Sequence, residues 1–208
     1  MLLAAGKGTR MGSDLPKVCH PIGGRAMVCA VVDACLDAGC DRIVVVVGYK
    51  QELVREALAE YGNTVEFAVQ DEQLGTGHAV MCAEGAFPEG MREGTDLFVL
   101  CGDGPLIRAE TLRTVLERHR SVGAAGTLAT SVIDDPSGYG RIELTGEYYI
   151  TDVFEGLLAE GKRVEVIDAV PPEDVLSINT PEHLAEVDRI FRGRALASGT
   201  HTSSEGTR

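Results

Sequence analysis

Residues 3–17 read Leu-Ala-Ala-Gly-Lys-Gly-Thr-Arg-Met-Gly-Ser-Asp-Leu-Pro-Lys, an apolar run that breaks into a glycine-rich, basic loop. Glycines let backbone N–H groups come close to an anion, and lysine and arginine supply the opposite charge. We therefore predict a strand that ends in a polyphosphate-binding loop. A glycine-rich turn with incidental basic residues is the alternative.

The spacing of this loop differs from two common phosphate-binding motifs. Met11 stands where the dinucleotide fingerprint needs its third glycine, and Gly12 comes one residue late. A Walker loop requires Gly-Lys-Ser/Thr four residues after a glycine, and this stretch has none. The sequence therefore excludes both motifs in their usual form.

Downstream of this loop, helical spacing of apolar residues alternates with short apolar runs typical of strands. The run at 42–47 is too apolar to have a face in water, as expected of a central parallel strand. The β-α-β-α order predicts a doubly wound α/β fold, Rossmann-like, with a mostly parallel sheet and helices on both faces. The expected helices are 25–40, 51–60, 76–86, 109–120, 150–160 and 181–192, and the expected strands are 42–47, 64–70, 96–101, 126–133, 163–170 and 175–178.

Length, charge and cysteine usage limit the class of protein. The 208 residues suffice for one domain, expected over 1–194, and the small polar residues 195–208 are expected to be a disordered tail. The net charge of −13 argues against a nucleic-acid partner, which needs a basic surface. No apolar stretch approaches the ~20 residues that span a bilayer, and no secretion signal is visible. The cysteines lie mostly in apolar runs without Cys-x-x-Cys pairs, which favours the cytoplasm.

Three polar loops, at 6–17, 70–77 and 102–107, each follow an expected strand. Ligands of such sheets bind beyond the carboxyl ends of the strands, so we expect one site there. Asp103 is placed to hold Mg²⁺, although an ordinary Asp-Gly turn is equally consistent. Gln70 carries the amide donors and acceptor needed to read a pyrimidine edge, and a solvated loop is its alternative.

Three further candidates have strong structural alternatives. Asn179 fits an N-cap, but Thr180 followed by Pro181 offers a competing cap that would leave the Asn179 amide oxygen free for a metal. His78 opens an expected helix, where a capping or core role is commoner than a ligand or base. The Gly-Tyr-Gly-Arg stretch at 138–141 permits close approach to a ligand, and a tight turn explains it equally well.

Taken in order, the motifs resemble one family. They are Leu-Ala-Ala-Gly-Lys-Gly-Thr-Arg-Met with Leu-Pro-Lys-Val, then Gln-x-x-Gln-Leu-Gly-Thr-Gly-His-Ala, Gly-Asp-x-Pro-Leu, Gly-Tyr-Gly-Arg-Ile and Gly-Glu-Tyr-Tyr-Ile-Thr-Asp. This order resembles the N-terminal uridylyltransferase domain of the bifunctional N-acetylglucosamine-1-phosphate uridylyltransferases, the GlmU family. Sugar-1-phosphate nucleotidyltransferases in general share the first loop and the Gly-Asp, whereas the second and last motifs point to this family. The resemblance extends to about residue 192.

The resemblance implies a Mg²⁺-dependent reaction of UTP with N-acetylglucosamine 1-phosphate, which gives UDP-N-acetylglucosamine and pyrophosphate for bacterial cell-wall polymers. It implies catalytic roles for Arg10, Lys17 and Asp103, and Mg²⁺ ligation by Asp103 and Asn179. It implies a sugar contact at Gly140, and Glu147 is a further sugar-binding candidate. The implied nucleotide-binding residues are Leu3, Ala4, Ala5, Gly6, Lys7, Gln70, Gly75, Thr76, Cys101 and Gly102.

The sequence departs from the family in three respects. The sequence begins only two residues before Leu3, so relative to the family we expect a shortened first strand, and no hexapeptide repeats of the acetyltransferase β-helix are present. Residues 143–145 alone separate two motifs between which the family has several dozen residues that grip the acetamido sugar. We therefore expect a complete nucleotide half and a shortened sugar half. A nucleotidyltransferase for another sugar phosphate, a non-catalytic fragment that binds UTP or a UDP-sugar, and the oligomeric state remain open.

Overall fold

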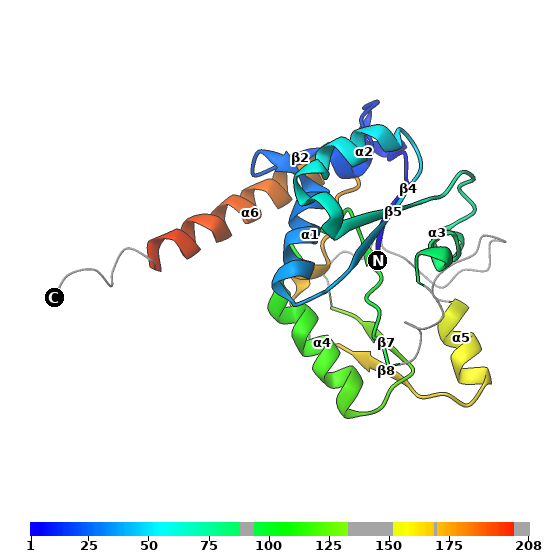
Figure 1. Ribbon diagram of the computed structural model, residues 1–208. Coiled ribbons are helices and arrows are strands. Elements are labelled where there is room, and N and C mark those ends of the chain that lie inside the picture. The colour runs from blue at the N-terminus through cyan, green and yellow to red at the C-terminus, as the bar shows by residue number, and fades with distance from the viewer. Residues whose placement is uncertain (88–93, 133–151, 169, 202–208) are drawn as a thin grey trace.

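A four-stranded parallel sheet forms the centre of the structure, a computed structural model that describes residues 1–87, 94–132, 152–168 and 170–201 (Figure 1). In spatial order the strands are β5 (Val65–Val69), β4 (Ile43–Val47), β1 (Leu2–Ala4) and β6 (Leu100–Cys101). Leu2 is in register with Val45 of β4, which in turn pairs with Phe67 of β5. All five residues of β4 are buried, which confirms the expected central strand at 42–47.

Helices cover both faces of this sheet. Helices α1 (Met27–Asp37), α2 (Gln51–Ala57) and α4 (Ala109–Ser121) lie on one side, and α3 (Thr76–Cys82) lies on the other (Figure 1). Because successive strand residues point to opposite faces, Ile43 and Val45 join the core under α1, whereas Val44 and Val46 join the core that includes α3. This arrangement confirms the predicted doubly wound α/β fold with a mostly parallel sheet.

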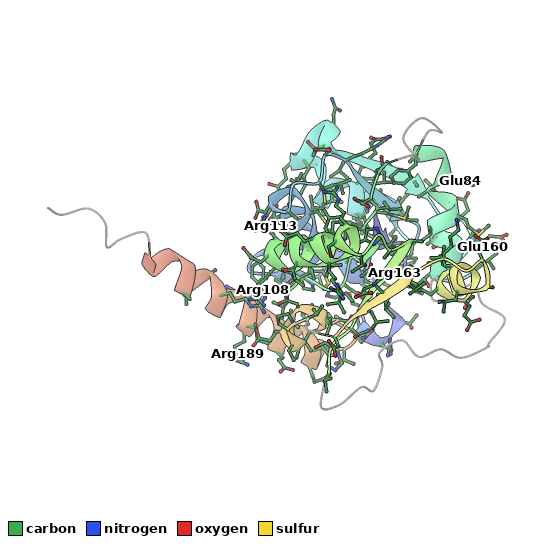
Figure 2. All side chains as sticks on the ribbon, turned by 90° about the horizontal axis from the view of Figure 1, so that it is seen from below. Glu84, Arg108, Arg113, Glu160, Arg163 and Arg189 are labelled. Atoms are coloured by element: carbon green, nitrogen blue, oxygen red, sulfur yellow. The ribbon has the colours of Figure 1, made fainter. Side chains whose placement is uncertain are left out.

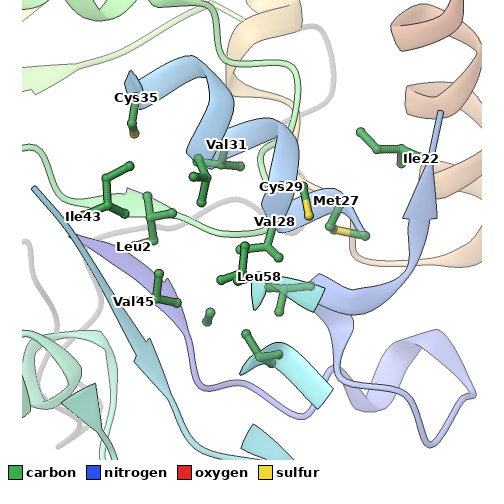
Figure 3. Close-up of a cluster of buried hydrophobic side chains, with 14 of the residues drawn as sticks. Leu2, Ile22, Met27, Val28, Cys29, Val31, Cys35, Ile43, Val45 and Leu58 are labelled. Carbon is green, nitrogen blue, oxygen red and sulfur yellow. The ribbon is translucent and has the colours of Figure 1, made fainter. Parts of the chain in front are cut away.

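The larger core lies between the sheet and α1. Leu2 and Val45 from the sheet pack with Val28 and Val31 of α1, and Leu58 belongs to the same cluster (Figure 3). None of these five side chains is more than 1% exposed. Burial of an aliphatic side chain of this size contributes about 1.5–3 kcal/mol, so the cluster holds β1 firmly at the point where the 6–17 loop begins.

Helix α1 ends in a Schellman motif. Gly39 has a φ of 90°, and its N–H donates to the Leu36 carbonyl (2.9 Å) while the Cys40 N–H donates to the Cys35 carbonyl (3.0 Å). The motif brings the two thiols together, and the hydrogen bond between them lowers the pKa of Cys40 and raises that of Cys35. Cys40 is therefore the more acidic of the pair.

Two smaller sheets accompany the central one. Strands β2 (Pro21–Ile22) and β3 (Arg25–Ala26) form an antiparallel hairpin, and β7 (Gly126–Ala129) pairs in parallel with β8 (Val164–Ile167). Helix α5 (Asp152–Ala159) packs beside β7, where a Cβ on Gly126 would lie 2.9 Å from the Leu157 side chain. Among the described residues, the 3-10 helices are η1 (Thr9–Met11), η2 (Lys17–Cys19), η3 (Ala59–Thr64), η4 (Glu84–Ala86) and η6 (Pro172–Val175).

An ionic cluster around the buried Asp174 joins η6 to α4 and to α6 (Pro181–His201). Asp174, which is 3% exposed, accepts hydrogen bonds from Arg108 Nε (2.9 Å), from the Thr111 hydroxyl and from Arg194 (3.2 Å). Arg108 lies at the start of α4, close to α6 (Figure 2). The cluster therefore ties the segment after β6 to the segment before α6.

The strand expected at 96–101 is shorter and more exposed than predicted. Pairing is confined to Leu100 and Cys101, which lie opposite Leu2 and Leu3, and Leu97 is 48% exposed. Strand β6 is at the edge of the central sheet, so within the described residues it has a pairing partner on one side only. The expected strand is therefore confirmed only at Leu100–Cys101, and the expectation that it is buried is wrong.

The C-terminal region also differs from expectation. Residues 175–178 form no strand, because Pro171 and Pro172 open η6 and Ile178 then makes an isolated backbone hydrogen bond to Asp103 (3.0 Å). Helix α6 continues to His201 through residues 195–201, which were expected to be disordered; 195–197 are strong helix formers. Residues 202–208 lie outside the described part. No described helix combines the length and apolar character needed to cross a membrane.

Candidate active site

A cavity of about 660 Å³ lies at the carboxyl ends of β1, β5 and β6, where the sequence predicts a site. Its wall is formed by Leu3, Ala4, Ala5, Gly6, Lys7, Gly8, Thr9, Arg10, Lys17, Val18, Gln70, Gln73, Gly75, Thr76, Ala79, Cys101, Asp103 and Asn179. The cavity brings together every predicted site residue that the structure describes except Gly102. Gly140 and Glu147, the two predicted sugar-binding residues, lie outside the described residues.

The basic loop owes its shape to two left-handed glycines. Gly8 (φ 70°) and Gly12 (φ 61°) flank the 3-10 helix η1, whose Met11 is buried and anchors the loop in the core. At Gly8 a Cβ would lie 2.6 Å from the Lys17 Cβ, so this position needs glycine for space as well as for conformation. The loop therefore packs directly against the stem of Lys17.

Four polar side chains from distant parts of the chain meet in the cavity. Lys17 Nζ donates to a carboxylate oxygen of Asp103 and to Asn179 Oδ1 (2.8 Å). Arg10 donates to the same Asn179 oxygen (2.8 Å). The side chains of Lys17 and Asp103 are 15% and 19% exposed, so the pair is largely withdrawn from water. Oxygens of Asp103 and Asn179 therefore converge on a single cationic group.

The structure decides between the two N-cap alternatives at the start of α6. Thr180 Oγ1 accepts a hydrogen bond from the His183 N–H (3.3 Å), as an N-cap residue does. Asn179 is thus free of the capping role, and its amide oxygen faces Arg10 and Lys17. The backbone bond from Ile178 to Asp103 (3.0 Å) holds the two oxygen-bearing segments side by side.

The donor set suits a hard divalent cation of the Mg²⁺ type. Mg²⁺ prefers one or two protein oxygens and takes its remaining ligands from water and substrate phosphates. Asp103 and Asn179 offer such a pair, already drawn together by the ammonium of Lys17. Among the described residues no group of three His, Cys, Asp or Glu side chains could form an all-protein metal cage. A metal held by these two oxygens would take the rest of its coordination from water or from the phosphates of a bound ligand.

The loop after β5 forms the opposite wall. Gln70 Nε2 donates to the Gly75 carbonyl (3.1 Å) and lies 3.1 Å from His78 Nδ1. Gln73 Nε2 donates to the Ala5 carbonyl (2.8 Å), which ties this loop to the end of β1. Gly75 has a φ of 103°, a conformation that other residues rarely adopt. The wall is thus held rigidly against the basic loop.

Cys101 and Gly102 occupy different positions although they are neighbours in sequence. Cys101 lines the cavity, and its pKa is raised to about 11, first by desolvation and then by the Asp103 carboxylate. Gly102 is buried beneath the wall, where its N–H donates to the Leu3 carbonyl (2.9 Å). A Cβ there would lie 3.1 Å from that same oxygen, so Gly102 serves the close packing of two strands.

Sequence reasoning missed five residues of the wall. They are Gly8, Thr9, Val18, Gln73 and Ala79. Gly8 and Thr9 belong to the basic loop, and Gln73 is the second glutamine of the Gln-x-x-Gln motif, so their motifs carried a signal. Val18 and Ala79 are ordinary apolar residues whose place in the wall depends on the packing of η2 and α3.

The fold and the site together define a class of protein. A parallel sheet whose first strand ends in a glycine-rich basic loop, facing a carboxylate and an amide oxygen, is the framework of a nucleotidyltransferase. Residues 1–145 match the model of the MobA-like NTP transferase domain, and the chain belongs to this family.

Curated relatives agree with this assignment. The chain is 40% identical to the bifunctional protein GlmU of Heliobacterium modesticaldum over 220 residues, which cover 97% of this chain and 46% of the relative. It is 37% identical to the protein of the same name from Bacillus thuringiensis over 243 residues, with coverages of 93% and 52%. The chain thus spans about half the length of these relatives. The matches confirm the predicted resemblance to the N-terminal domain of GlmU.

A solved structure shares the fold. A nucleotidyl transferase from Methanothermobacter thermautotroptrophicus superposes with a TM-score of 0.68 at 24% identity, covering 93% of this chain and 96% of the other. At this level of identity the likeness supports the nucleotidyltransferase fold alone.

Proposed function

We propose that this chain transfers a uridylyl group from UTP to a sugar 1-phosphate, with N-acetylglucosamine 1-phosphate as the acceptor. A phosphate oxygen of the acceptor attacks the α-phosphorus of UTP, and the bond between that phosphorus and the bridging oxygen to the β-phosphate breaks. The products are UDP-N-acetylglucosamine and pyrophosphate. The observation that supports this proposal best is the meeting of Arg10, Lys17, Asp103 and Asn179 beside the basic loop.

The reaction requires the protein to hold two anions, UTP and the sugar 1-phosphate, in position and to offset their negative charge. The attacking phosphate oxygen is already ionised at neutral pH, so no general base is required. Lys17 and Arg10 lie where they can offset negative charge on the triphosphate, together with the backbone N–H groups of the glycine loop. Alignment of two bound anions in a fixed geometry supplies the remaining acceleration.

Asp103 and Asn179 would hold Mg²⁺, which would neutralise charge on the phosphates of UTP. Since Lys17 now contacts both oxygens, we expect its ammonium to turn toward the phosphates when a divalent cation is bound. Lys17 would then contact the triphosphate, and the oxygens of Asp103 and Asn179 would bind the metal.

The opposite wall would receive the nucleoside. Gln70, Gly75 and Thr76 are proposed to contact the base, with the stretch 3–7 and Cys101 along the ribose and phosphates. Gln70 and Thr76 both line the cavity, as does every residue of 3–7. Gly102 is proposed to contribute through the close packing that places Cys101 rather than by direct contact.

A specific observation keeps a second function under consideration. The alignment with the Bacillus protein runs over 243 positions but includes 93% of this 208-residue chain, so several dozen positions of the relative have no counterpart here. The motifs at 138–151 suggest that the gap falls in the sugar-binding part, with Gly140 and Glu147 at its borders. A shortened sugar-binding part is what we expect of a transferase that accepts several sugar phosphates, or of a fragment that binds UTP without turnover.

Pyrophosphate release from UTP distinguishes these functions. We expect Mg²⁺-dependent release with N-acetylglucosamine 1-phosphate, abolished by EDTA, with glucose 1-phosphate accepted nearly as well. Each missing hydrogen bond to the acetamido group forgoes about 1 kcal/mol of selectivity. UTP binding measured by calorimetry, without release for any acceptor, would refute the transferase in favour of the binding fragment.

A further inference from the structure

Both N–H groups of the Gln70 side-chain amide have a hydrogen-bond acceptor nearby. Gln70 is buried, with 4% of its surface exposed, yet it lines the cavity. Nε2 carries two protons, and two acceptors lie within reach: the Gly75 carbonyl oxygen (3.1 Å) and His78 Nδ1 (3.1 Å). The Gly75 oxygen can only accept, so it identifies the amide atom beside it as nitrogen. Oxygen Oε1 is then the polar atom that Gln70 can offer to a ligand.

The same geometry determines the tautomer of His78. Because Nε2 of Gln70 donates, Nδ1 of His78 must accept, and the neutral imidazole carries its proton on Nε2. That ring nitrogen lies 3.7 Å from the sulfur of Cys82, one helical turn further along α3, and the same sulfur lies 3.9 Å from Nδ1. His78 is therefore oriented from α3 with its lone pair toward Gln70.

We infer that His78 is a positioning residue that sets the base specificity of the cavity, by holding the Gln70 amide with its oxygen toward the nucleotide. This inference rests on the proposed function, since it places a nucleotide base beside Gln70. It goes beyond that function because it assigns to His78 a role that involves no contact with the substrate.

The fixed oxygen selects bases by their hydrogen-bond pattern. An acceptor at this point matches the N3–H of uracil, whereas N3 of cytosine is itself an acceptor and would face Oε1 without a proton between them. If the amide turned over, Nε2 would suit cytosine, but its oxygen would then oppose the Gly75 carbonyl and, as long as the His78 ring keeps its proton on Nε2, the lone pair of Nδ1. Two acceptors thus resist the rotation, and His78 supplies one of them.

Replacement of His78 by an acceptor and by a non-acceptor tests this role. In His78→Asn the side-chain oxygen can take the place of Nδ1, whereas His78→Leu fills the space without accepting. Cys82→Ala is the control, because it removes the sulfur that contacts both ring nitrogens and leaves the contact between Gln70 and His78 Nδ1 in place. The measurements are the dissociation constants of UTP and CTP with Mg²⁺ by calorimetry, and kcat/KM for pyrophosphate release with each nucleotide.

We expect His78→Leu to reduce the preference for UTP over CTP about five- to tenfold, the equivalent of one hydrogen bond. His78→Asn and Cys82→Ala should keep the preference within about twofold of the unmodified chain, well short of one lost hydrogen bond. Thermal unfolding of each variant separates a change in specificity from a loss of fold.

Two results would overturn the inference while the proposed function stands. One is a UTP preference that His78→Leu leaves intact; the other is an unmodified chain that binds UTP and CTP equally and still releases pyrophosphate. Failure of the unmodified chain to bind either nucleotide would overturn the inference and the proposed function together.

Discussion

Replacement of Gly8 by alanine should uncouple the basic loop from Lys17. Gly8 adopts a φ of 70°, and its Cα packs so closely on Lys17 that a Cβ would lie 2.6 Å from the Lys17 Cβ. Carbon atoms in van der Waals contact are about 3.5–4.0 Å apart, so the loop and the lysine stem must separate by about 1 Å. Gly12 provides a matched control, because it has a φ of 61° and open space around the position of a Cβ.

Both substitutions strain the backbone, but only Gly8→Ala also displaces Lys17. An L-residue in the left-handed region costs about 1–2 kcal/mol, and we expect both variants to lose this much free energy of unfolding. Gly8→Ala has the added displacement of Lys17, whose ammonium contacts Asp103 and Asn179. Because a misplacement of 1 Å in an active site can cost about 10²-fold in rate, we expect kcat/KM to fall by about that factor.

Pyrophosphate release and urea unfolding, measured on both variants, check this reasoning. Gly12→Ala should unfold more easily than the unmodified chain while its kcat/KM falls no more than about fivefold, since no displacement of 1 Å accompanies it. Gly8→Ala should have lower activity and lower affinity for UTP than the unmodified chain even under conditions in which the urea measurements show that it is folded. Equal activity in the two variants would show that close packing of Gly8 on Lys17 is irrelevant to the site.

Further predictions concern the metal, the ionic cluster and the thiols. Asp103→Asn should keep its shape but lower Mg²⁺-dependent pyrophosphate release at least about 10²-fold, and near-normal activity in a Mg²⁺ titration would refute metal binding there. Asp174→Ala should lower the free energy of unfolding in urea by about 2 kcal/mol, less than for a fully buried ion pair because its arginine partners reach solvent. At pH 7.5 iodoacetamide should label Cys40 before Cys101, because a hydrogen bond lowers the pKa of Cys40 whereas desolvation raises that of Cys101 to about 11; peptide mass spectrometry would detect the reverse order.

The basic loop and the central strand could be predicted because their signals are local. Close approach of backbone to an anion requires glycine, and charge requires lysine or arginine, so residues 3–17 indicate their role without reference to any other segment. The run at 43–47 is apolar at every position, which suits a strand covered on both faces. The strand at 96–101 failed as a prediction because its exposure depends on a place at the edge of the sheet, which no local pattern encodes.

In the site, too, some features could not be predicted from local sequence patterns. Gly102 belongs to the predicted Gly-Asp motif, but the proximity of the Leu3 carbonyl places it beneath the cavity wall rather than in it. For Asn179 the sequence offered an N-cap role or a free amide oxygen, and the hydrogen bond from His183 to Thr180 gives the N-cap to Thr180. Both outcomes depend on which backbone groups become neighbours.

By itself, the sequence determined the alternation of strands and helices, the glycine-rich and basic character of the first loop and the family to which the chain belongs. The tertiary structure alone decided that Lys17 contacts Asp103, 86 residues away, and Asn179, 162 residues away. It also decided that the Gln70 amide nitrogen lies 3.1 Å from His78 Nδ1. The physical reason is that motifs record short-range geometry and charge, whereas hydrogen bonds between distant segments depend on strand order and helix packing, which form only when the whole sheet assembles.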